Sequence, residues 1–290
     1  MTTFYLPDAE RVVLVLSTGR TGTKALAHVL GGCYPEVCAL HEPPPSRFLL
    51  RRASNRFLCE KLQRDQLVAL LYRCRSPLPT GPTQRVYFES NPNLVGFLDA
   101  FPDVFQHFQV LHVVRDPRTY IRSAINWGVF GGARGWLARY LPFWLPKPEL
   151  IQPDVVASWR HMSEVERLAW HWQFINRHLD RGNALFPDRY RMVRFEDLFA
   201  RDGTGLADLV EWMGLTPAQG LATEGERVNA SRPGQIPPWS EWSDEDKLSV
   251  LRHCAPLMRA YGYDLSAEAH LLEPEQTPVH ASLAGSSGVG

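Results

Sequence analysis

The sequence predicts a three-layer α/β fold with a mostly parallel central sheet. An apolar run, RVVLVLS (11–17), leads into a loop of small residues and then into a helical pattern. Further strand-like runs at 85–89, 109–115 and 190–196 alternate with helical patterns, as in parallel sheets covered by helices. The 290 residues are 44% apolar, which is enough for one domain with a substantial core.

The first strand and helix are the clearest local pattern. The run 11–17 is apolar at nearly every position, as expected for a strand buried on both faces. After the loop, apolar residues recur at helical spacing over 25–30, and Gly31 and Gly32 are expected to end this helix. Strand 109–115 is followed by an Asp-Pro pair, which is typical of a helix start.

The second half of the chain continues the alternation. A long helix is predicted over about 157–181, followed by a strand at 190–196 and a short helix at 205–214. A last helix is predicted over 243–262, with a kink at Pro256.

Residues 1–265 are therefore predicted to form a single domain, and 266–290 a poorly ordered tail. Two inserts interrupt the pattern, the basic stretch 46–84 and the aromatic, proline-rich stretch 129–159. The second insert could form a substrate lid or an apolar acceptor pocket, or could simply dock on the core.

Charge and cysteine content limit the class of protein. The 31 basic and 31 acidic side chains cancel, so the overall charge favours neither nucleic acid nor an anionic membrane as partner, and any anion site must come from locally placed arginines. The five cysteines form no C-x-x-C pair, which favours a reduced compartment over a disulfide framework and argues against a zinc site. No apolar run approaches the roughly 20 residues of a membrane span, so we expect a cytoplasmic protein.

The loop in LVLSTGRTGTKAL (14–26) is typical of a phosphate site but lacks the ATP signature. The pattern G-x-x-x-x-G-K-[ST] fits at Gly22 only, because Thr23 stands where the lysine belongs and Lys24 where the hydroxyl belongs. Backbone N–H groups at a helix N-terminus form a ready anion site. Arg20 adds a permanent cation that could neutralise charge on a leaving oxygen.

A second motif, VVRDPRTYIRSAINWG, follows the strand at 109–115. Arg115 ends this strand, and Ser123 lies eight residues on, where two helical turns bring it back toward the strand end. An arginine and a hydroxyl can hold a second phosphate, so the two motifs suggest a nucleotide with phosphates at both ends. His112, within the apolar strand, is predicted to be a hydrogen-bonded core residue and not a catalyst.

These two motifs resemble those of the sulfotransferases that use 3'-phosphoadenosine 5'-phosphosulfate (PAPS), and LAWHWQFINRHL, YRMVRFEDL and NASRPGQIPPWSEWSDEDK are also similar. The resemblance covers about residues 10–45 and 86–264 and implies a fold like that of P-loop NTPases. It implies that PAPS is the co-substrate and that no metal is needed. The implied 5'-phosphosulfate ligands are Arg20, Thr21, Gly22 and Thr23, and the implied 3'-phosphate ligands are Arg115, Ser123 and Arg232. Gly19 and Lys24, in the same loop, are also predicted to bind the cofactor. Lys24 departs from the family pattern, which usually has a hydroxyl residue there.

The implied reaction is in-line transfer of a sulfuryl group to a hydroxyl of a small molecule, glycan or lipid. Glu42 is the predicted base, by its likeness to a catalytic glutamate of the arginine-type relatives, and His41 is the competing candidate. The alternatives are a small-molecule kinase of the P-loop class, disfavoured by the misplaced lysine, and a catalytically silent nucleotide-binding protein. The sequence indicates neither the acceptor nor the oligomeric state.

Overall fold

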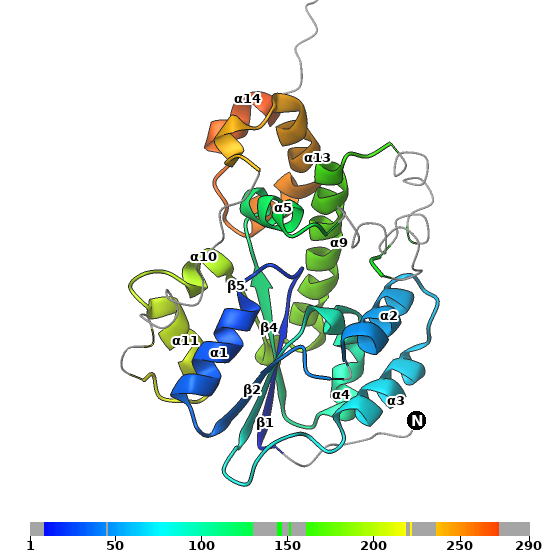
Figure 1. The fold of residues 1–290 in the computed structure, drawn as a ribbon, viewed down its shortest axis with the longest axis vertical. Coiled ribbons are helices and arrows are strands. Elements are labelled where there is room, and N and C mark those ends of the chain that lie inside the picture. The colour runs from blue at the N-terminus through cyan, green and yellow to red at the C-terminus, as the bar shows by residue number, and fades with distance from the viewer. Residues whose placement is uncertain are drawn as a thin grey trace, which may run out of the picture.

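The structure is a computed structural model that describes residues 9–44, 46–129, 144–146, 151, 161–218, 221 and 236–272, with only the backbone described at 46 and 47. In this part of the chain, five parallel strands form one sheet in the order β2-β3-β1-β4-β5 (Figure 1). The strands are β1 (Arg11–Leu16), β2 (Val37–His41), β3 (Val86–Ser90), β4 (Phe108–Val114) and β5 (Tyr190–Arg194). The predicted α/β class with a parallel sheet is confirmed.

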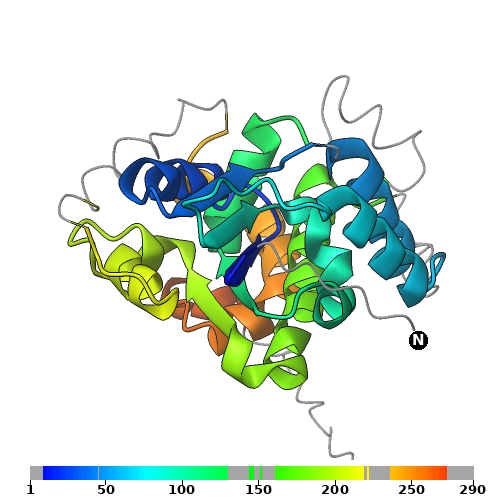
Figure 2. The same cartoon turned by 90° about the horizontal axis from the view of Figure 1, so that it is seen from below.

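Helices cover both faces of this sheet. The α-helices that the structure describes are α1 (Thr23–Cys33), α2 (Ser46–Leu58), α3 (Arg64–Arg75), α4 (Phe101–Val104), α5 (Pro117–Asn126), α9 (Glu164–Leu185), α10 (Phe195–Leu198), α11 (Thr204–Trp212), α13 (Asp244–Ala260) and α14 (Ala269–Leu272). The 3₁₀ helices are η1 (Pro92–Ala100), η3 (Pro187–Arg189), η4 (Trp239–Glu241) and η5 (Ser266–Glu268). Figure 2 shows α1 and α11 on one side of the sheet and α2 and α3 on the other.

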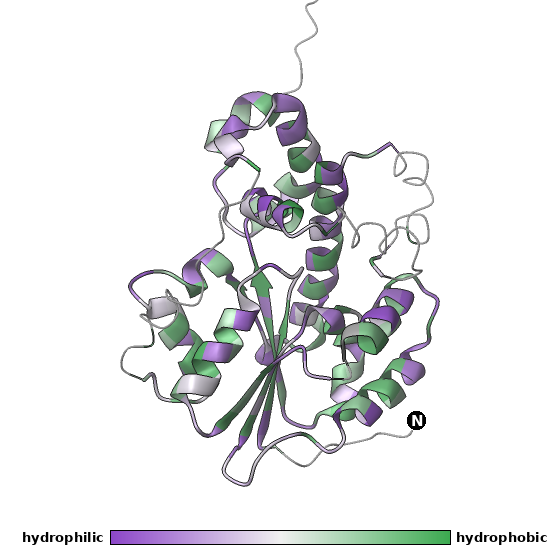
Figure 3. Cartoon of the chain, viewed as in Figure 1, coloured by the Kyte–Doolittle hydropathy of each residue, from purple (hydrophilic) through white to green (hydrophobic). Residues whose placement is uncertain are grey.

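The alternation of β1 explains the three layers. Val12, Leu14 and Leu16 point to one face, where they pack in a core with α2, α3, η1 and α9. Val13 and Val15 point to the other face and pack with α1 and α11. Both faces of the strand are therefore buried, as its continuous apolar sequence predicts, and the strands are mainly hydrophobic in Figure 3. A third cluster joins α5, α9 and α13 beyond the carboxyl ends of the strands.

Two helices end later than the sequence predicts. Helix α1 continues through Gly31 and Gly32 to Cys33, because a helical glycine costs only about 1 kcal/mol relative to alanine and the buried Tyr34 anchors the last turn. Helix α9 continues through Gly182 to Leu185. A Cβ at Gly182 would lie 2.4 Å from the Tyr190 ring, so this glycine serves close packing against β5 and not termination.

The inserts and the tail also differ from expectation. The insert 46–84 forms α2 and α3. The strand predicted at 190–196 is shorter than expected, because β5 ends at Arg194 and α10 begins at the next residue. Helices η5 and α14 lie beyond residue 265, where we expected the tail to begin. The buried Glu268 accounts for this, since it pairs with Arg118 and accepts a hydrogen bond from the Trp239 indole. Residues 273–290 and most of the insert 129–159, including its expected lid or pocket, lie outside the described residues.

No helix in the described part of the chain is both long and apolar enough to cross a bilayer.

Candidate active site

The candidate site lies along the edge of the sheet where all five strands end. Ligands of open parallel sheets bind at this carboxyl edge. The strand order places the ends of β1 and β4 side by side, and the first motif follows β1 while the second follows β4. Helices α5, α13 and α14 lie above this edge in Figure 1.

The loop after β1 is shaped by its own hydroxyl groups. The buried Ser17 Oγ accepts hydrogen bonds from the Gly19 N–H (3.1 Å) and from Thr21 Oγ1 (2.7 Å). Gly19, Arg20 and Gly22 all have left-handed backbones, with φ of 80°, 58° and 69°. The loop thus turns tightly onto the N-terminus of α1, whose first N–H groups have no partner within the helix.

Two of the predicted loop ligands face inward. Thr21 is fully buried and Thr23 nearly so, and the Thr21 hydroxyl is used by Ser17. We therefore expect these two residues to meet a ligand through their backbone N–H groups. Lys24, by contrast, is exposed on the first turn of α1.

Gly22 is required by packing as well as by its left-handed backbone. A Cβ at this position would lie 2.7 Å from the Phe195 ring and 2.8 Å from the Phe199 ring. Both rings belong to the segment that follows β5, and they pack against each other with centroids 5.2 Å apart. The two phenylalanine rings that follow β5 therefore pack against the loop that follows β1.

Arg20 links the first motif to the second. Its Nε donates a hydrogen bond to Ser123 Oγ on α5 (3.1 Å), and its guanidinium lies 4.6 Å from the centre of the Trp127 ring. Trp127 is 51% exposed, so its ring forms part of the surface of the site. The sequence analysis did not identify this tryptophan, although it lies one helical turn beyond Ser123.

Arg115 closes the same link from the other side. Its Nη1 donates to the backbone oxygen of Arg20 (2.7 Å), and its Nε donates to Thr119 Oγ1 (3.0 Å). The guanidinium lies 4.6 Å from the centre of the Phe195 ring. Burial lowers the pKa of Arg115, but an arginine stays protonated at neutral pH. Two permanent cations and a hydroxyl thus meet at the start of α1.

The two candidate bases lie on the far side of β3. His41 ends β2, where its Nδ1 lies 2.7 Å from Ser90 Oγ, and the Glu42 N–H donates to the Ser90 oxygen (3.0 Å). His41 Nε2 and Glu42 Oε1 are 3.9 Å apart. Glu42 has a left-handed backbone, with φ of 46°. Because β3 separates β2 from β1, about two strand spacings, or roughly 10 Å, lie between these residues and the loop.

A buried ionic network fixes the end of β3, which lies between the candidate bases and the loop after β1. Glu89 is fully buried and binds Arg75 through both carboxylate oxygens (2.5 and 2.6 Å). The same carboxylate accepts hydrogen bonds from Tyr87 and Asn91. The Asn91 N–H in turn donates to Val15 of β1 (3.0 Å). This network, which the sequence analysis did not identify, holds the strand that spaces the candidate bases from the loop.

Several further residues can now be placed. His112 is fully buried and bonded to Tyr190 and Asn176, which confirms it as a core residue. Arg232 lies outside the described residues. Among the described residues, no cluster of three or more His, Cys, Asp or Glu side chains is arranged to hold a metal ion.

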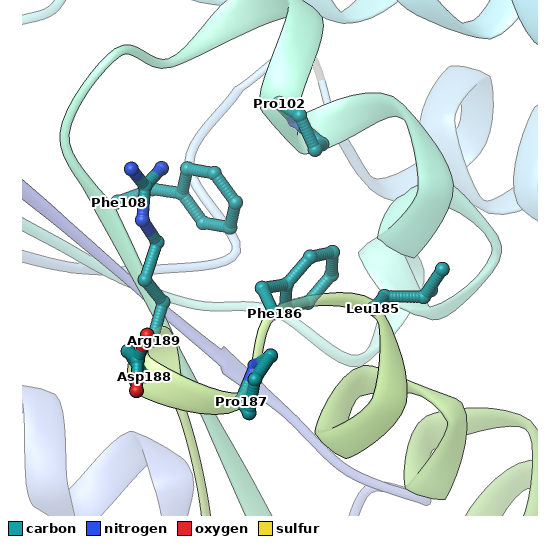
Figure 4. A pocket seen from close by; sticks show the side chains of 7 residues that line it. All are labelled: Pro102, Phe108, Leu185, Phe186, Pro187, Asp188 and Arg189. Carbon is teal, nitrogen blue, oxygen red and sulfur yellow. The ribbon is translucent and has the colours of Figure 1, made fainter.

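A cavity of about 260 Å³ lies at the opposite edge of the sheet and takes no part in this site (Figure 4). It is bounded by Phe108 at the start of β4 and by the residues leading into β5, from Leu185 to Arg189.

Comparison with known structures concerns the fold. The fold is similar to that of the sulfotransferase domain of the Synechococcus PCC 7002 olefin synthase, with a TM-score of 0.50 and 18% identity over 89% of this chain and 96% of that one. Lower scores are found for a sulfotransferase from Alicyclobacillus acidocaldarius (0.46, 13% identity, 88% and 97% covered) and for mouse sulfotransferase SULT7A1 complexed with PAP (0.49, 12% identity, 88% and 86% covered).

No protein of curated function matches the sequence significantly. The model of the sulfotransferase family matches residues 13–219, which include both motifs and most of the chain. The chain therefore belongs to the sulfotransferase family.

Proposed function

We propose that this protein transfers a sulfuryl group from PAPS to a hydroxyl group of an acceptor. The observation that carries the proposal is the junction of Arg20, Ser123 and Arg115, in which residues about 100 positions apart meet at the start of α1. Guanidinium, hydroxyl and helix N-terminal N–H groups together suit a ligand with several anionic groups.

The donor set fits a nucleotide with phosphates at both ends. In this proposal the loop and Arg20 hold the 5'-phosphosulfate, while Arg115 and Ser123 hold the 3'-phosphate. Arg20 lies in the loop after β1 and Arg115 directly follows β4, so in this proposal each guanidinium serves a different anionic group of the nucleotide. Gly19 and Lys24 as further 5' ligands, and Arg232 as a further 3' ligand, stay predictions.

PAPS supplies an activated sulfuryl group, and the chain's residues supply charge and a base. As the acceptor oxygen bonds to sulfur, the bond from sulfur to the 5'-phosphate breaks and the phosphate gains negative charge. Arg20 stabilises that charge, and we propose that Glu42 takes the acceptor's proton, with His41 as the alternative. Because β3 lies between β2 and β1, the backbones of these two strands are about 10 Å apart, and we propose that the acceptor hydroxyl and the sulfuryl group lie in this interval.

We propose that the acceptor is a small molecule, a glycan or a lipid. A cytoplasmic location stays a prediction. The decisive test is an acceptor screen with sulfur-labelled PAPS, using phenols, sugars and lipid alcohols. Arg20→Ala is the inactive variant, and Arg85→Ala, at an exposed arginine directly before β3, is the matched control. We expect label transfer by the wild type and its loss in Arg20→Ala. Phosphoryl transfer from ATP with magnesium would contradict the proposal. Tight binding of PAP, the desulfonated product, with no turnover on any acceptor would instead indicate a silent nucleotide-binding protein.

A further inference from the structure

Helix α2 presents large apolar side chains to solvent. Phe48 is 58% exposed and Leu49 is 43% exposed, and they are neighbours on the first turns of the helix. Arg52 is also exposed. It lies four residues after Phe48 and three after Leu49, so it shares their side of the helix. In Figure 3, α2 contains both hydrophobic residues (green) and hydrophilic residues (purple). A helix that lies on a membrane surface places large apolar side chains in the lipid boundary and basic side chains beside them.

The opposite side of α2 packs against the core and η1. This packing fixes which side chains of the helix face solvent. Leu50 and Leu58 lie in the core. Ser54 Oγ accepts a hydrogen bond from the Gly96 N–H of η1 (2.8 Å), and a Cβ at Gly96 would lie 2.5 Å from the Ser54 backbone oxygen. The helix cannot turn its apolar residues inward without losing this close contact.

The segment of the chain that contains these apolar residues is rich in basic side chains. The segment 46–84 has eight basic and two acidic side chains, whereas the rest of the chain has 23 basic and 29 acidic ones. Helix α2 itself contains four arginines and no acid. Some of this charge is internally paired, since Arg75 binds Glu89 and Arg64 binds Asp103. The neutral chain is thus divided into a basic segment and an acidic remainder.

We infer that the exposed face of α2, formed by Phe48, Leu49 and Arg52, docks on an anionic lipid surface. The apolar side chains enter the boundary between headgroups and acyl chains, and the basic segment adds electrostatic attraction. A second copy of the chain is a poor occupant, because a two-fold contact would set the same basic segment against itself. Since α2 begins four residues after Glu42, docking would bring the candidate site close to the lipid surface. The docking itself does not depend on the proposed activity.

Sedimentation of the full chain with lipid vesicles tests this inference. The vesicles are phosphatidylcholine alone or phosphatidylcholine with phosphatidylglycerol, each at low and high salt. The variants are Phe48→Ser with Leu49→Ser, and Arg52→Glu. The matched control is Leu185→Ser, which removes a side chain of similar exposure (46%) at the end of α9. Thermal unfolding is measured for each variant to check that it is folded.

We expect the wild type to sediment with the phosphatidylglycerol vesicles, and less so at high salt. The double variant should bind on the order of a hundredfold more weakly, because two apolar side chains no longer leave water. Arg52→Glu should bind roughly tenfold more weakly, and this exposed substitution serves if the double variant fails to fold. Leu185→Ser should bind as the wild type does.

Three results would overturn the inference. One is that the wild type does not sediment with either kind of vesicle. Another is that the α2 variants and the Leu185 control bind equally well. The third is that the wild type is a dimer that the α2 substitutions dissociate, which would assign this face to a second copy.

Discussion

Replacing Arg20 by alanine should abolish most sulfuryl transfer while leaving the fold intact. The side chain is exposed, and its contacts include a hydrogen bond to Ser123 and the approach to the half-exposed Trp127. A cation over an exposed ring contributes about 0.5–1 kcal/mol and a hydrogen bond about 0.5–1.5 kcal/mol, so the free energy of unfolding should fall by about 1–2 kcal/mol. Alanine keeps a Cβ and leaves the left-handed backbone of this position as strained as before.

The effect on catalysis should be much larger. A group placed to stabilise charge in the transition state is worth about 2.7–4 kcal/mol, or about 10²–10³ in kcat. Arg20→Lys should recover part of this rate, since it keeps the charge but loses the planar fork that reaches Ser123. Arg20→Gly should be as inactive as Arg20→Ala and at least as stable, because glycine relieves about 1–2 kcal/mol of left-handed strain.

The assay is release of PAP from PAPS with an accepting hydroxyl compound, run beside urea unfolding of each variant. A kcat within threefold of wild type in Arg20→Ala would refute the role of the guanidinium. A loss of stability of several kcal/mol would show that Arg20 is structural and that the activity loss is indirect.

Three further predictions follow from the same geometry. Ser123→Ala should leave stability unchanged and weaken PAP binding about 10- to 100-fold in calorimetry, as expected for a lost hydrogen bond to a charged group, and an unchanged Kd would count against a phosphate contact. Gly22→Ala should lower the free energy of unfolding in urea by about 1–3 kcal/mol because its Cβ would meet Phe195, whereas Gly19→Ala, which meets open space, should cost about 1 kcal/mol, so equal losses would refute the packing argument. Burial lowers the pKa of His112 from 6.5 to about 4, so the unfolded chain takes up this proton first and stability should fall as pH drops from 6.5 toward 4. Urea unfolding across this range should show a flatter pH dependence in His112→Asn, by up to about 1.4 kcal/mol per pH unit, and an identical slope would contradict the buried neutral state.

The sequence was sufficient for the features that are local. A continuous apolar run marks a strand buried on both faces, and β1 is such a strand. The eight-residue step from Arg115 to Ser123 follows from helix geometry, and both side chains do reach Arg20. His112 was correctly assigned to the core because it interrupts an otherwise apolar strand.

Features that depend on the order of strands in space were beyond the sequence. Nothing in the local pattern indicates that β3 inserts between β2 and β1, and this insertion sets the spacing from Glu42 to the loop. Phe195 supports that loop from a position more than 170 residues away, so its role depends on packing alone. Ser17 was the nearest to being predictable, since a hydroxyl four residues before Thr21 can bond across a tight turn.

Titration of the protein with PAP in the presence of a magnesium chelator tests the proposed nucleotide site without any knowledge of the acceptor. We expect PAP to raise the melting temperature and to bind in calorimetry. Arg20→Ala and Arg115→Ala should each weaken this binding, and Lys24→Ala should weaken it less. Stabilisation by ATP with magnesium, and none by PAP, would contradict the proposal.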